Sequence, residues 1–107
     1  MPMRIYNKLV RDKIPGIIEK NGGKCRLHIL NDEEYLAALD RKLSEELSEY
    51  LESGSMEEIA DLLEVIRAVI IARGSTMDEV ETIRAAKAAE RGAFDKKIEL
   101  ISVEDGV

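Results

Sequence analysis

The chain has 107 residues, of which 45% are apolar, so it can bury one hydrophobic core, and we expect a single domain covering residues 1–107. Its 22 acidic and 16 basic residues give a net charge of -6, which disfavours binding to nucleic acid or to an anionic membrane surface. No apolar run reaches the roughly 20 residues of a membrane-spanning helix, and the single Cys25 cannot form an internal disulfide. We therefore expect a cytoplasmic protein.

The N-terminal part of the sequence predicts an extended arm, a short helix and a short strand. Residues 1–6 carry no helical pattern. Asp12 can cap a short helix that has Pro15 in its first turn and ends at residues 21–23, Asn-Gly-Gly. Residues 24–30 then alternate between polar and apolar side chains, which is typical of a strand.

Three longer helices are predicted next, and the start of each carries a capping residue. Asn31 with Glu34, and Ser55 with Glu58, have the spacing of a capping box. The predicted helices run from 31 to about 52, from 55 to 73, and from 75 or 76 to about 91. A tail strand at 96–103 could pair with 24–30. The predicted fold class is therefore all-α: a helical hairpin and a third helix that form a four-helix-type bundle on oligomerisation, with a small two-stranded accessory sheet.

Acidic residues are placed symmetrically about Gly54, in the turn between the first two long helices. Glu49 and Glu58 lie five residues before and four after it, and Glu46 and Asp61 lie eight before and seven after. At about 1.5 Å per residue, an antiparallel hairpin sets Glu49 level with Glu58 and Glu46 level with Asp61. Four carboxylates at one place repel one another unless a cation binds, so the spacing indicates a metal site.

A second interpretation treats these acids as ordinary solvated helix faces. It has local support, because Glu45 can pair with Lys42 or Arg41 and Glu64 can pair with Arg67 along the same helices. Under this interpretation the protein is a non-catalytic helical interaction module.

Asp61 favours the metal site, because the helix around it is apolar on nearly every side and is expected to be buried between others. A buried carboxylate costs several kcal/mol unless it is paired or bound to a metal, and no basic residue lies one turn away from Asp61. His28 and Cys25 are isolated in the sequence, so the ligands are oxygen atoms alone. Oxygen ligands select hard ions, which makes Mg²⁺ the expected ion and Mn²⁺ a substitute.

The pattern Glu-Glu-x-x-Glu followed by Glu-x-x-Asp on paired helices resembles the all-α nucleotide pyrophosphohydrolases of the MazG type. Two further stretches are similar to the phosphoribosyl-ATP pyrophosphohydrolase-like, or house-cleaning, branch of that superfamily. They are Tyr-Asn-Lys-Leu-Val-Arg-Asp-Lys-Ile-Pro at 6–15 and Lys-Ala-Ala-Glu-Arg-Gly-Ala-Phe at 87–94. Together the three stretches cover the chain from end to end. The eight residues between Glu49 and Glu58 are fewer than in larger members of the superfamily, so the hairpin is tight.

The resemblance implies roles for individual residues. The metal-binding positions are matched by Glu46, Glu49, Glu58 and Asp61. Glu45 matches the remaining motif acid, which holds a second ion or orients the attacking water, and these five acids form the expected catalytic set. The residues expected to bind substrate phosphates are Lys8, Arg11, Lys87 and Arg91, for which ordinary surface charge is the alternative.

The resemblance further implies Mg²⁺-dependent hydrolysis of a nucleoside triphosphate, or a related nucleotide, to the monophosphate and pyrophosphate. The expected biological role is the removal of non-canonical nucleotides, and the alternative within the enzymes is phosphoribosyl-ATP hydrolysis in histidine synthesis. Beyond its nucleotide substrate, the expected partner is the chain itself, as a homodimer or homotetramer, because a helix that is apolar on all sides leaves surface to cover.

Overall fold

The computed structural model describes residues 2–106, and the part of the chain it describes is all-helical, which confirms the predicted fold class. The helices are α1 (Ile14–Lys20), α2 (Asp32–Ser53), α3 (Met56–Ala72) and α4 (Met77–Arg91). The chain divides into two compact units: the first extends to Ser75 and holds α1, α2 and α3, and the second begins at Thr76 and holds α4 and the tail. No helix among residues 2–106 is long and apolar enough to cross a membrane.

The starts of the three long helices follow from their capping residues. Asn31 and Glu34 form a full capping box, in which Glu34 N–H donates to Asn31 Oδ1 at 2.8 Å and Asn31 N–H donates to Glu34 Oε1 at 3.0 Å. Ser55 caps α3 and Thr76 caps α4 through their side-chain oxygens, which accept from Glu58 N–H and Glu79 N–H; for Ser55 this is one half of the predicted capping box. All three predicted starts are therefore confirmed, and the ends lie within one residue of prediction.

The short helix α1 begins differently from the prediction. Its N-cap is Lys13 rather than Asp12, and no side chain caps it. The first turn is closed by the backbone instead, because Ile14 N–H donates to the carbonyl of Arg11 at 3.0 Å. Pro15, which has no N–H to donate, lies in this first turn as predicted.

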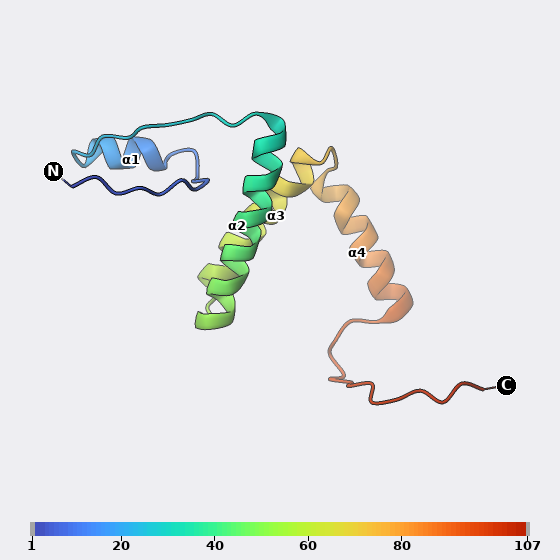
Figure 1. The fold of residues 1–107 in the computed structure, drawn as a ribbon. Coiled ribbons are helices and arrows are strands. Elements are labelled where there is room, and N and C mark those ends of the chain that lie inside the picture. The colour runs from blue at the N-terminus through green and yellow to red at the C-terminus, as the bar shows by residue number, and fades with distance from the viewer. Residues whose placement is uncertain (1, 107) are drawn as a thin grey trace. The chain divides into compact units, whose positions relative to one another are not determined.

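Helices α2 and α3 form an antiparallel hairpin and pack against each other (Figure 1). The turn between them reverses at Gly54, whose φ of 66° lies in the left-handed region that glycine adopts without steric cost. Their buried apolar residues form the core of the first unit: Ala38 and Leu39 on α2, and Val65 and Ile70 on α3. The hairpin is thus the element that positions the acidic residues described below.

The expectation that α3 is buried on all sides is wrong for the single chain. Val65 and Ile70 are buried, but Leu63 on the same helix is 55% exposed and Ile71 is 52% exposed. Helix α2 covers one face of α3 and leaves much of its apolar surface open. Exposed apolar residues are also found on α2 itself, at Leu47 and Leu51.

The two predicted strands are also wrong, because residues 24–30 and 96–103 form no strand within the described chain. Alternation of polar and apolar residues sets which side chains share a face, but a strand forms only when its backbone groups find a hydrogen-bonded neighbour. An isolated two-stranded pair is marginal in water even when both segments are available. In both segments most of the apolar side chains are instead exposed, with Ile29 and Ile101 among them.

Candidate metal centre

Five carboxylates from α2 and α3 gather at one place on the hairpin. One oxygen each of Glu45, Glu46 and Glu49 lie within 4.8 Å of one another, and so do one oxygen each of Glu46, Glu58 and Asp61. Glu46 belongs to both groups and is therefore the centre of the cluster. The helices supply this arrangement directly, since residues three and four apart lie on one face of a helix and the turn brings the two faces together.

Glu46 is the buried member of the cluster. It is 7% exposed, and its Oε2 is buried without a hydrogen-bond partner among the described residues. Burial, and then the adjacent carboxylate of Glu49, raise the pKa of Glu46 above its usual value, while Lys42 acts in the opposite direction. A buried carboxylate oxygen with no donor is costly, so this atom is where a ligand is needed most.

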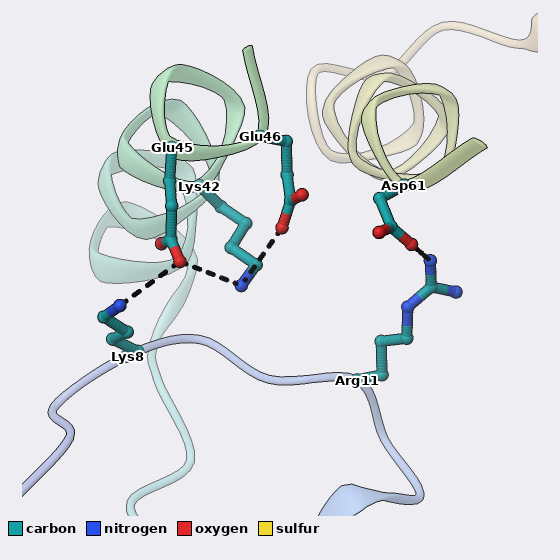
Figure 2. Close-up of polar contacts among 6 residues, drawn as sticks. All are labelled: Lys8, Arg11, Lys42, Glu45, Glu46 and Asp61. Carbon is teal, nitrogen blue, oxygen red and sulfur yellow. Dashed lines mark hydrogen bonds and ion pairs between the residues drawn. The ribbon is translucent and has the colours of Figure 1, made fainter. Parts of the chain in front are cut away.

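Lys42 is a member of the cluster that the predicted site residues do not include. Its Nζ lies 3.4 Å from Glu46 Oε1 and 3.7 Å from Glu45 Oε1, and its side chain is largely buried (Figure 2). The signal in the sequence is the spacing, because Lys42 precedes Glu46 by four residues and so lies one helical turn away on the same face. The chain therefore supplies one counter-charge from within α2 itself.

The N-terminal segment supplies two further cations, one to each helix of the hairpin. Lys8 Nζ lies 3.2 Å from Glu45 Oε1 on α2, and Arg11 Nη2 donates to Asp61 Oδ1 on α3 at 2.7 Å. Figure 2 shows both side chains reaching from this segment toward the carboxylates. Two of the predicted phosphate-binding residues are thus brought to the acidic cluster, and each contacts an acid of the predicted catalytic set.

Asp61 is not the buried, unpartnered carboxylate that its apolar helix predicts. The side chain of Asp61 is 44% exposed rather than buried, and Arg11 is its partner. The reason is that α3 is covered on one side only, so Asp61 lies at the edge of the hairpin interface. The carboxylate whose burial calls for a cation is Glu46, which is on α2.

A cavity of about 510 Å³ opens beside the cluster. Glu46, Asp61 and Lys42 line one part of it, and the apolar side chains of Val10 and Leu39 and the ring of Tyr35 are also in its wall. Ligand pockets of proteins fall in this size range and combine apolar walls with a few polar groups. The cavity therefore gives a small molecule access to the carboxylates.

The remaining predicted residues lie in the second unit. Lys87 and Arg91 are in the last part of α4, which has no buried residue. Their assignment as phosphate ligands stays a prediction.

The donor set fits a hard divalent cation. Every candidate ligand is a carboxylate oxygen, and five carboxylates exceed the three cationic side chains of Lys8, Arg11 and Lys42 in the cluster. Mg²⁺ prefers oxygen ligands of this kind, and Mn²⁺ accepts the same set. An ion would be held either by Glu45, Glu46 and Glu49 or by Glu46, Glu58 and Asp61, so the four predicted ligands Glu46, Glu49, Glu58 and Asp61 do not all lie in one of these groups.

The chain is similar to a known protein over part of its length. No family model matches the sequence, and no solved structure matches it. A protein of Mycolicibacterium smegmatis is 50% identical over 42 residues, which are 39% of this chain and 43% of the relative. The chain thus spans less than half the length of this relative. The relative is described as an uncharacterized protein.

Proposed function

We propose that this protein is a Mg²⁺-dependent nucleotide pyrophosphohydrolase, which converts a nucleoside triphosphate or a related nucleotide to the monophosphate and pyrophosphate. The observation that carries the proposal is the buried, unpartnered Oε2 of Glu46 at the centre of five carboxylates. The resemblance of the acidic pattern and its flanking stretches to MazG-type enzymes supplies the reaction. Removal of non-canonical nucleotides is the proposed role.

Each part of the cluster has a task in this reaction. Glu46, Glu49, Glu58 and Asp61 would hold the Mg²⁺ ion. When bound, the ion would supply charge neutralisation at the phosphate oxygens, which is much of what phosphoryl-type transfer requires. Glu45, which is partly exposed beside them, accepts the proton of the attacking water.

The basic side chains bind the phosphate groups of the substrate. Lys8 and Arg11 are already at the carboxylates, so phosphates held there would lie within their reach. Lysine and arginine bind phosphate through charge-assisted hydrogen bonds, which are roughly twice as strong as neutral ones. The cavity beside the cluster accommodates the rest of the nucleotide.

The proposal predicts that Mg²⁺ stabilises the protein and that nucleotides are cleaved only in its presence. At a hundredfold excess of Mg²⁺ over its Kd, a single site raises the free energy of unfolding by about 2.7 kcal/mol. Thermal unfolding followed during Mg²⁺ titration measures this effect. A stability that changes no more with Mg²⁺ than with an equal ionic strength of NaCl would contradict the metal site and favour the non-catalytic helical module.

Release of pyrophosphate from a panel of substrates then identifies the reaction. The panel contains canonical nucleoside triphosphates, modified nucleoside triphosphates and phosphoribosyl-ATP. Turnover that is highest for modified nucleotides supports the removal of non-canonical nucleotides, whereas turnover confined to phosphoribosyl-ATP assigns the protein to histidine synthesis. Absence of turnover for every substrate in saturating Mg²⁺ would contradict the proposed activity.

We also expect the chain to assemble as a homodimer or homotetramer. The exposed apolar residues of the hairpin, with Leu51, Leu63 and Ile71 among them, are the surface to be covered. Light scattering coupled to size-exclusion chromatography should give at least twice the 12.0 kDa of one chain. A mass of one chain at micromolar concentration would show that this surface has no second copy on it.

A further inference from the structure

We propose that Lys8 and Arg11 exchange partners when a divalent cation binds. Without the ion they neutralise Glu45 and Asp61, and with it they leave these carboxylates and become free to bind phosphate. The inference rests on the proposed function, because it concerns the same carboxylates and explains how their occupancy controls phosphate binding.

The first argument is that the two cations lie on carboxylates of the cluster at which the ion would bind or beside which it would lie. Arg11 occupies Oδ1 of Asp61 at 2.7 Å, and Lys8 occupies Oε1 of Glu45 at 3.2 Å. A Mg²⁺ ion bonds to carboxylate oxygens at about 2.0–2.1 Å, so it would lie only a few ångströms from the guanidinium and the ammonium. Like charges at that distance repel one another, and the ion therefore opposes both contacts.

The second argument is that the N-terminal segment can leave, whereas Lys42 stays. Lys8 and Arg11 belong to an irregular segment that precedes α1, and their side chains are more than half exposed. Exposed ion pairs are weak, corresponding to about fivefold or less in an equilibrium constant. Lys42 is held on α2 next to Glu46, with a side chain that is only 21% exposed, so it is less free than Lys8 and Arg11 to move away from the ion.

The exchange couples metal binding to phosphate binding. An ion that frees Lys8 and Arg11 raises the affinity for phosphate, and by reciprocity phosphate raises the affinity for the ion by the same factor. Without the ion, the two cations are engaged by carboxylates and the affinity for phosphate is low. The protein therefore has a lower affinity for nucleotide when no metal is bound.

The test compares Arg11→Gln with Arg67→Gln in the full chain. Arg67 is a matched control, because it lines the same cavity but pairs with Glu64 on its own helix, at 3.7 Å. Calorimetric titration should give a Kd for Mg²⁺ that is about two- to fivefold lower for Arg11→Gln than for the wild type, since a competitor is removed. Arg67→Gln removes a nearby positive charge that does not contact the cluster. We expect it to lower the Kd for Mg²⁺ by less than Arg11→Gln does.

Two further measurements follow the side chain of Arg11 and the binding of phosphate. The first is the NMR resonance of Arg11 in the wild type, and the second is the affinity for inorganic phosphate. The Nε–H resonance of Arg11 should move during Mg²⁺ titration with the calorimetric midpoint, and inorganic phosphate should bind more tightly in saturating Mg²⁺ than in EDTA. In Arg11→Gln this gain should be reduced.

The outcomes separate the two proposals. Absence of Mg²⁺ binding to the wild type would overturn the proposed function and this inference together. Mg²⁺ binding that Arg11→Gln strengthens no more than Arg67→Gln does, with an unmoved Arg11 resonance, would overturn the exchange and leave the metal centre in place.

Discussion

Replacing Glu46 with Gln should reduce Mg²⁺-dependent pyrophosphate release by at least about 100-fold. Loss even of a residue that only supports a metal ligand costs 10- to 100-fold in affinity or activity, and Glu46 is the central ligand of the proposed site. The variant should also lose the stabilisation by Mg²⁺. Activity is measured as pyrophosphate release and metal binding by calorimetry.

The same substitution should leave the metal-free protein at least as stable as the wild type at neutral pH. Burial raises the pKa of Glu46 in the folded state above the ordinary value of 4.5, so the folded protein binds this proton more tightly than the unfolded chain does. The carboxyl of Glu46 therefore favours folding most below its unfolded pKa, and this contribution is lost as the pH rises through the folded pKa. Gln carries no charge at any pH and avoids that loss.

Denaturant unfolding in EDTA at pH 7 and at about pH 4 measures this effect. The difference in free energy of unfolding between Glu46→Gln and the wild type should be more favourable to the variant at pH 7 than at pH 4. A matched control is Glu57→Gln, which changes an exposed acid of α3 outside the cluster. A Glu46→Gln variant with wild-type turnover would show that the metal centre is wrongly placed.

Replacing Leu39 with Ala should lower the free energy of unfolding by about 2–5 kcal/mol, which is the usual cost of removing a buried leucine side chain and leaving a cavity. Leu39 is 2% exposed and is the largest fully buried side chain of the described chain. Small domains have about 5–15 kcal/mol of total stability, so the loss is a large share of it. Urea unfolding of the metal-free protein measures the change.

Leu100→Ala provides the comparison, because Leu100 is 74% exposed in the tail. We expect it to change the free energy of unfolding by no more than about 0.5 kcal/mol. Leu39 also lies seven residues before Glu46, about two turns along the same face of α2, so its loss should weaken Mg²⁺ binding as well. Equal effects of the two substitutions would mean that Leu39 is not part of the core.

The local features of the hairpin could be predicted from the sequence, because each depends on residues close together in the chain. The starts of α2, α3 and α4 follow from Asn31, Ser55 and Thr76. The gathering of the acids follows from helical rise and from one short turn at Gly54. Both the helix starts and the position of the acids can therefore be predicted without knowing where the rest of the chain lies.

The contacts that the sequence did not predict depend on segments far apart in the chain. Arg11 and Asp61 are 50 residues apart, and the segment that carries Arg11 has no periodic pattern from which its path could be read. The burial of Glu46 rather than Asp61 depends on how α2 and α3 are rotated against each other, and apolar content alone does not determine this rotation. The strands are absent for the same reason. The alternation at 24–30 does not determine whether another segment lies alongside to form the backbone hydrogen bonds of a sheet.

The turn at Gly54 also affects how the proposed metal centre would assemble. All five carboxylates lie within residues 45–61, on two helices joined by one tight turn. Bringing them together closes only a short loop, so little chain entropy opposes the ligand set, and no distant part of the chain must be in place first. Contacts this local form early in folding. The metal centre would then exist as soon as the hairpin does, and it could bind its ion before the N-terminal segment arrives.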